Sequence, residues 1–118
     1  MFFKKDEQQC EVKSNLKGGT GDLHFRNVVP ADMLYGAGTF VSVVTFEPGQ
    51  SIGVHDHVSN FEIYYVLEGE ATVTDNGEER ILKPGDSEIC ANGNTHSIAN
   101  KGSENLVIMA MLLNNFQK

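Results

Sequence analysis

Short runs of β-branched and aromatic residues alternate with glycine, proline and asparagine along most of this chain, and helical periodicity is almost absent. Turn signals such as Pro48-Gly49 and Asn76-Gly77 separate the runs. This pattern predicts an all-β fold, a sandwich or jelly-roll barrel, with a single helical turn at 30–35. The predicted strands are 23–29, 39–46, 62–67, 70–74, 79–82, 87–90, 96–100 and 106–113.

Composition limits the setting and the partners. A length of 118 residues fits one domain, and 16 acidic against 9 basic residues give a net charge of −7, so we expect neither nucleic acid nor a membrane as partner. Cys10 and Cys90 form no paired motif, which predicts free thiols and a cytoplasmic protein. The longest apolar run, 106–113, is too short to span a bilayer, and the start of the chain is not typical of a leader peptide.

The histidines give the first sign of chemistry. His55 and His57 are two residues apart, so on a strand their side chains point to the same face and can share one metal ion. Glu62 begins a hydrophobic strand, where a carboxylate needs a partner or a metal. A His-x-His pair alone is equally compatible with a surface strand of no function. The metal hypothesis therefore depends on the combination with Glu62, the flanking glycines and the distant His96.

Two segments resemble the signature motifs of the cupin superfamily. The segment from Gly49 to Gly69 reads G-x5-H-x-H-x4-E-x6-G, and the segment from Gly85 to Asn100 reads G-x5-A-N-G-x2-H-x3-N. The second motif departs from the family at Ala91, where proline is usual, and this change affects a turn and no ligand. Together the motifs cover roughly a third of the chain.

The resemblance implies a double-stranded β-helix, the jelly-roll cupin barrel, in which His55, His57, Glu62 and His96 bind one divalent transition metal. Nitrogen and oxygen donors suit Mn, Fe, Ni, Co or Zn and do not decide among them. One carboxylate against a divalent ion leaves a positive centre, so we expect a small-molecule ligand, a small carboxylate or similar oxygen-rich anion. Small single-domain cupins that are similar to this chain include oxalate-binding-type proteins.

The resemblance leaves the activity open, because one fold supports many reactions. The protein is either a metal-dependent enzyme of the dioxygenase or decarboxylase type, or a non-catalytic binding or sensing module, and a metal-free structural barrel is the remaining reading. A sugar isomerase or epimerase is a further alternative, although the strands carry few basic residues to hold a phosphate. Tyr64 shares a face with Glu62 and is the candidate catalytic residue, able to orient or protonate a ligand. The alternative for Tyr64 is a core aromatic with its hydroxyl satisfied at the rim.

Other residues are assigned by strand alternation. Arg26 is the candidate for a carboxylate clamp beside the metal, and Asn100 either bonds near the pocket or supports a turn. We expect the metal to face a small, largely apolar cavity. The expected lining is Tyr64, Phe46 or Phe40, and Met109 and Met111 of the last strand.

We divide the chain into an N-terminal arm, 1–17, and a single cupin barrel domain, 18–118. The arm carries apolar residues that need a docking surface, and a glycine cluster follows it. Because small cupins commonly dimerise, we expect a homodimer to whose interface the arm contributes.

Overall fold

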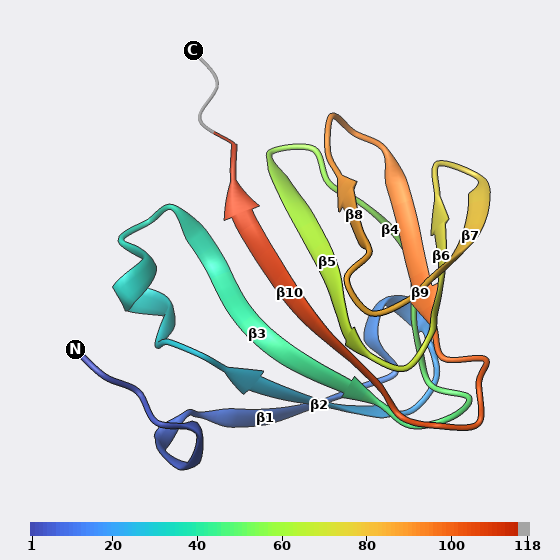
Figure 1. Cartoon of the computed structure of the whole chain (residues 1–118). Helices are drawn as coiled ribbons and strands as arrows, with labels where there is room; N and C mark the ends of the chain where they lie inside the picture. Colours follow the sequence, from blue (N-terminus) through green and yellow to red (C-terminus); the bar gives the residue numbers. More distant parts are fainter. Residues whose placement is uncertain (116–118) are drawn as a thin grey trace.

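The computed structural model describes residues 1–115 and consists of short strands with three brief 3-10 helices (Figure 1). None of its helices is long and apolar enough to cross a membrane. The 3-10 helices are η1 (Lys5–Glu7), η2 (Leu16–Gly18) and η3 (Ala31–Leu34). The strands are β1 (Cys10–Ser14), β2 (Asp22–Asn27), β3 (Gly38–Phe46), β4 (Ser51–Asp56), β5 (Asn60–Glu68), β6 (Ala71–Asp75), β7 (Glu78–Leu82), β8 (Ser87–Cys90), β9 (Thr95–Ala99) and β10 (Leu106–Asn114).

The strands form two antiparallel sheets. One sheet has the order β1-β2-β3-β10-β5-β8, and the other has the order β4-β9-β6-β7 (Figure 1). The chain crosses repeatedly between the sheets, which is the connectivity of a jelly roll. The all-β prediction is therefore confirmed. The last three residues of the expected barrel domain, 116–118, lie outside the described residues.

The predicted strands are present, with ends shifted by one or two residues. The β6–β7 hairpin turns at Asn76 and Gly77, which both have positive φ, as expected for a tight two-residue turn between twisted strands. The helical turn predicted at 30–35 is η3. Two strands, β1 and β4, were not among the predicted runs, because half or more of the residues in each are polar or glycine.

The core lies between the two sheets and takes alternate residues from seven of the strands, β2 to β6, β9 and β10. Side chains that face inward are almost completely shielded from solvent, whereas their neighbours in sequence are exposed or half-exposed. Cys90 is buried and Cys10 exposed, and both are free thiols, as predicted. The core consists of Leu23, Phe25, Val44, Phe46, Ile52, Tyr64, Val66, Ala71, Val73, Ile98, Leu106, Ile108 and Ala110.

The N-terminal segment is part of the fold. Strand β1 pairs with β2 at the edge of the six-stranded sheet, and η2, in the connection between them, lies against β4 of the other sheet (Figure 1). The backbones of η2 and β4 can lie this close only because glycines stand at the contact. A Cβ on Gly53 would lie 2.1 Å from the Lys17 carbonyl oxygen, and a Cβ on Gly19 would lie 2.3 Å from the Ser51 carbonyl oxygen. The connection thus joins both sheets at one end of the barrel. The division into an arm and a barrel stays a prediction.

Candidate metal centre

The two sheets bring four predicted ligands together in the interior. His55 on β4 is directly opposite His96 on β9, and His57 follows at the end of β4. Glu62 reaches the same point from β5 in the other sheet. One donor atom from each of the four residues lies within 4.8 Å of the others. His57, Glu62 and His96 are buried, and His55 is half-buried.

Hydrogen bonds to the outer nitrogens fix the orientation of the three rings. In each histidine, Nδ1 faces an oxygen acceptor outside the cluster and therefore carries the ring proton in the neutral form. Such acceptors behind a histidine are typical of metal sites, where they set the tautomer. The bonds run from His55 to the Gly53 carbonyl oxygen (2.8 Å), from His57 to Asn60 Oδ1 (2.7 Å) and from His96 to Glu88 Oε1 (3.0 Å).

The inner nitrogens converge on a single carboxylate oxygen. Nε2 of His55, His57 and His96 lies 3.3, 3.1 and 3.0 Å from Oε1 of Glu62, and Nε2 of His96 lies 2.9 Å from that of His55. Donors held at right angles about 2.1 Å from one metal lie about 3.0 Å apart, against about 3.4 Å in a tetrahedron. The donor set therefore fits a metal ion, and its spacing is closer to octahedral than to tetrahedral.

The ionised carboxylate and the ring nitrogens of the cluster together favour a positive charge at its centre. Burial raises the pKa of Glu62, but the hydrogen bonds with the three histidines outweigh it and hold that pKa far below its usual value. Burial lowers the pKa of His96, but the hydrogen bonds with Glu62 and Glu88 raise it to about 9. The carboxylate is thus ionised, and either protons or a metal cation must neutralise the convergent lone pairs. Metal binding requires neutral imidazoles and would displace those protons.

The cluster opens into a small cavity of about 230 Å³. Glu62 and Tyr64 point into it together, as strand alternation predicted. The expectation for β10 was wrong: Ala110 and Leu112 line the cavity, whereas Met109 and Met111 lie on the opposite face of the strand. On β3, Phe40 lines the cavity and Phe46 is buried in the core below.

Tyr64 occupies an unusual position beside the cluster. Its ring stacks on that of His96, with centroids 4.6 Å apart and planes only 6° from parallel. The side chain is fully buried, and its hydroxyl has no hydrogen-bond partner within residues 1–115. Burial and the charge of Glu62 raise the pKa of Tyr64 well above its usual value, so the hydroxyl stays protonated. Tyr64 is thus a core aromatic, as its alternative reading expected, and its role toward a ligand stays a prediction.

Two further sequence assignments are settled by geometry. Arg26 does not reach the cavity; its guanidinium donates to Gln8 on the other face of β2, so it is no clamp beside the cluster. Asn100 supports a turn: its amide donates to the carbonyl oxygens of Phe46 and Glu104 (3.0 and 2.8 Å). Its Oδ1 accepts from the backbone of the same loop.

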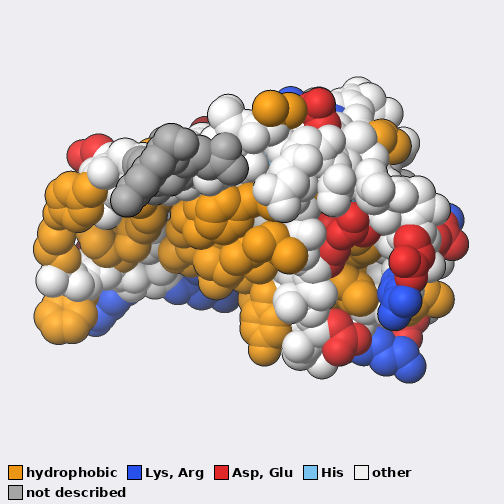
Figure 2. All heavy atoms as spheres, turned by 90° about the horizontal axis from the view of Figure 1, so that it is seen from above, with side chains coloured by type: hydrophobic (Ala, Val, Ile, Leu, Met, Phe, Trp, Pro, Cys, Tyr) orange, Lys and Arg blue, Asp and Glu red, His pale blue; other side chains and the backbone are white. Residues whose placement is uncertain are grey.

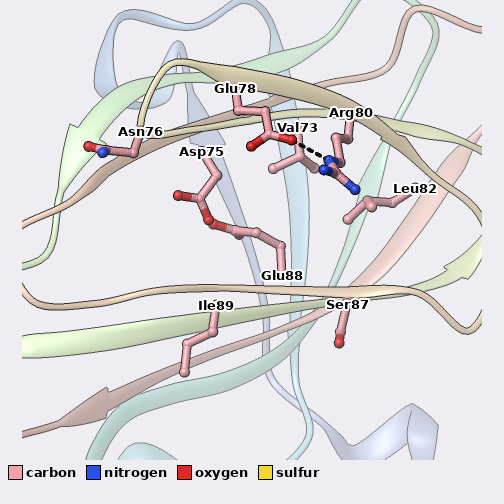
Figure 3. Close-up of a pocket in the computed structure, with 9 residues that line it drawn as sticks. All are labelled: Val73, Asp75, Asn76, Glu78, Arg80, Leu82, Ser87, Glu88 and Ile89. Atoms are coloured by element: carbon pink, nitrogen blue, oxygen red, sulfur yellow. Dashed lines mark hydrogen bonds and ion pairs between the residues drawn. The ribbon is translucent and has the colours of Figure 1, made fainter.

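A larger hollow of about 500 Å³ lies on the other side of His96, between β6, β7 and β8. Figure 3 shows Asp75 and Glu88 pointing toward one another across it, while Glu78 pairs with Arg80 at its edge. Burial raises the pKa of Glu88, which also bonds to His96. Glu88 therefore connects this hollow to the back of the metal cluster.

Glu88, Cys90 and His96 also form a geometric group of possible ligands. Burial raises the pKa of Cys90 to about 12, so its sulfur remains a thiol, and it donates to the Asn94 carbonyl oxygen. Because a thiolate is the form that binds metals, this group is the poorer site.

Sequence reasoning missed two residues of the site, Glu88 and Lys13. Glu88 shares a strand face with the buried Cys90, and that alternation could have placed it inside. Lys13, which lines the cavity, belongs to the segment that was interpreted as an arm. No motif marks it, because its position depends on the pairing of β1 with β2.

Comparisons with known proteins agree with this arrangement. Residues 42–112 match the family model of the cupin domain. An oxalate-binding protein of Thermotoga maritima is 32% identical over 113 residues, which cover 96% of this chain and 93% of that protein. A crystal structure is known for a Thermotoga maritima protein described as a predicted oxalate decarboxylase, whose sequence is 31% identical to this one. The two structures superpose with a TM-score of 0.91, and the match covers 98% of this chain and 100% of that chain. A candidate sugar phosphate isomerase from Acidithiobacillus ferrooxidans is 25% identical with a TM-score of 0.69, covering 80% of this chain and 60% of that one.

Proposed function

The chain belongs to the cupin domain family, and from that premise we propose that His55, His57, Glu62 and His96 bind one divalent transition metal and present it to a small carboxylate. The main support is the convergence of the three Nε2 atoms on Oε1 of Glu62. Every Nδ1 already has a hydrogen-bond partner outside the cluster, so the Nε2 atoms are the ones left to bind a metal. A bound metal supplies a positive centre that attracts carboxylate oxygens. The near-octahedral spacing favours Mn, Fe, Co or Ni over Zn.

The residues around the cluster suit a small anion. Glu62 contributes a single negative charge, so the filled centre keeps a net positive charge. The protonated hydroxyl of Tyr64 donates a hydrogen bond to a ligand oxygen, which gives this buried group its missing partner. Phe40, Ile52 and Leu112 provide apolar walls that exclude bulk water. A low dielectric strengthens both polar interactions.

The size of the cavity and a relative support a carboxylate of few atoms. The cavity of about 230 Å³ is smaller than the roughly 300 Å³ at which pockets for drug-sized molecules begin. The Thermotoga maritima relative is an oxalate-binding protein. Binding of a small carboxylate is therefore the function that we favour.

Decarboxylation is the second candidate, and Tyr64 is the observation that favours it. Loss of one carboxylate of oxalate as CO2 requires one proton at the remaining carbon to give formate, and Tyr64 holds a proton beside the cluster. Incubating metal-loaded protein with oxalate and measuring CO2 and formate tests this role. Release at the rate of a Tyr64→Phe variant would exclude Tyr64 as the proton donor, and no release would leave binding as the function.

The binding proposal is tested in two steps. Protein purified without a nickel resin should contain close to one transition metal ion per chain by elemental mass spectrometry. Thermal shift with small dicarboxylates and with sugar phosphates should then show stabilisation by the dicarboxylates in the metal-loaded form only. Stabilisation by sugar phosphates alone would instead point to an isomerase or epimerase.

We also propose that the protein is a homodimer built on the outer face of the six-stranded sheet. Residues that are cross-strand partners share a face, and on this outer face most of them are apolar. Figure 2 shows hydrophobic side chains gathered on the side of β3 and β10, with charged side chains mixed at the opposite side. Ile89, Tyr65 and Leu67 are 55%, 40% and 40% exposed. The pairs that form the face include Met109 with Val43 and Tyr65, Met111 with Val41 and Ile63, and Ile63 with Ile89.

Strand β1 lies at the edge of the same sheet, which supports a contribution of the N-terminal segment to the interface. Light scattering of a shortened chain that begins at Gly18 should show a weakened dimer. An unchanged dimer would show that the segment makes no contribution.

A further inference from the structure

Lys13 is a basic residue at an inward-facing position of β1. It pairs with Leu23 of β2, which is fully buried, and paired residues point to the same face of a sheet. Val12 and its partner His24, one position along, are both exposed on the other face. The register of the hairpin therefore directs a lysine toward the interior of the barrel.

The ammonium group of Lys13 has aromatic neighbours but no counterion. Nζ lies 4.3 Å from the ring centroid of Phe25 and 4.9 Å from that of Phe40. No carboxylate within residues 1–115 lies within 4.0 Å of this Nζ. The side chain is half-buried and lines the same cavity as Glu62. Aromatic faces orient a cation but do not neutralise it, so the group is poised for an anion.

The register of the six-stranded sheet sets the spacing between Glu62 of the metal cluster and Phe40, the ring beside Lys13. Leu112 on β10 is opposite Glu62 on one side and opposite Phe40 on the other. Two strand spacings, about 10 Å, therefore separate the backbone of Glu62 from that of Phe40, over whose ring Lys13 lies. The floor between the two polar ends is apolar. Lys17 and Asp56, both exposed, lie at the rim.

We propose that Lys13 is the second anchor of the ligand, and that the ligand is an aliphatic dicarboxylate longer than oxalate. One carboxylate occupies the metal centre, the methylene chain lies over Leu112 and Phe40, and the far carboxylate accepts a hydrogen bond from Lys13. This inference rests on the proposed metal centre. The cavity of about 230 Å³ has room for about eight groups of the size of water, which suits a four-carbon dicarboxylate. An apolar floor suits methylenes better than the hydroxyl groups of a sugar.

The test compares succinate with butyrate, which has the same number of carbons but only one carboxylate. Calorimetric titration uses the full chain loaded with manganese(II), after metal retention has been checked. We expect succinate to bind at least about tenfold more tightly than butyrate, as a charge-assisted hydrogen bond supplies. Lys13→Met keeps the apolar stem and should remove that difference without changing butyrate binding, while Lys13→Arg should retain most of it. Lys83→Met, on the exposed surface, is the control and should bind like the unaltered protein.

The outcomes separate the two proposals. Equal affinities for succinate and butyrate in the unaltered protein would overturn the role of Lys13 and leave the metal centre standing. The same conclusion follows if Lys13→Met weakens oxalate as much as succinate, because oxalate is too short to reach the second anchor. Failure to retain any of manganese, iron, cobalt and nickel, or to bind any of the three acids once loaded, would overturn the proposed function and this inference with it.

Discussion

Replacing Tyr64 with phenylalanine separates the role of its hydroxyl from that of its ring. The substitution keeps the stacking on His96 and removes one buried oxygen that has no partner within residues 1–115. A buried hydroxyl without a hydrogen bond costs about 1–3 kcal/mol relative to water. The ligand-free protein should therefore become more stable by about 1 kcal/mol or more, although most core substitutions destabilise.

The gain in stability can be measured by thermal unfolding. For a domain of this length, 1 kcal/mol corresponds to a rise in Tm of about 4 °C. Calorimetry of metal-free Tyr64→Phe should show this rise, and titration of the metal-loaded variant should show carboxylate binding weakened by about tenfold. The substitution should raise the stability of the ligand-free protein and lower its affinity for the carboxylate, because the hydroxyl lacks a hydrogen bond without the ligand and gains one with it.

Tyr65→Phe is the matched control, since the neighbouring ring lies on the outer face and is 40% exposed. It should change neither Tm nor ligand affinity. A lower Tm for metal-free Tyr64→Phe would mean that the hydroxyl already has a partner, such as a bound water. Unchanged ligand affinity would mean that Tyr64 is a packing residue only.

Three further predictions address the metal, the fold and the assembly. Replacing both His55 and His57 with alanine should reduce the metal content, measured by elemental analysis, to background. The circular dichroism spectrum should remain that of a β protein, and retained metal would disprove the ligand set. Gly53→Ala should lower the free energy of unfolding in urea by about 1–3 kcal/mol, because its Cβ would lie 2.1 Å from a carbonyl oxygen of η2. Gly102→Ala, whose Cβ would meet its nearest atom at 3.5 Å, should change little, and equal losses would refute the steric argument. Met111→Arg should convert the dimer to a monomer in light scattering; a persistent dimer would place the interface elsewhere.

The sequence predicted the ligand cluster because its parts are local and alternate regularly. The His-x-His spacing and the inward direction of Glu62 and Tyr64 follow from strand alternation alone, and the structure brings them together as expected. The prediction that His96 joins His55 at the same metal came from the family motif, because no local rule pairs residues so far apart in sequence.

The errors arose where both faces of a strand are apolar. In β10 the outward Met109 is as hydrophobic as the inward Ala110, because the outer face of that sheet is itself apolar. Alternation in hydrophobicity then carries no information about direction. Lys13 was missed for the opposite reason: a polar residue that faces inward resembles a surface residue until its pairing with Leu23 is known.

Gly53 joins the two halves of the site through one residue. Its carbonyl oxygen orients His55, and its missing side chain leaves room for the backbone of Lys17, which closes the hairpin that carries Lys13. A substitution at this position would therefore disturb both contacts at once, the one with His55 and the one with Lys17. A side chain at this position would push the connection between β1 and β2 away from β4, and Lys13 would move with that hairpin.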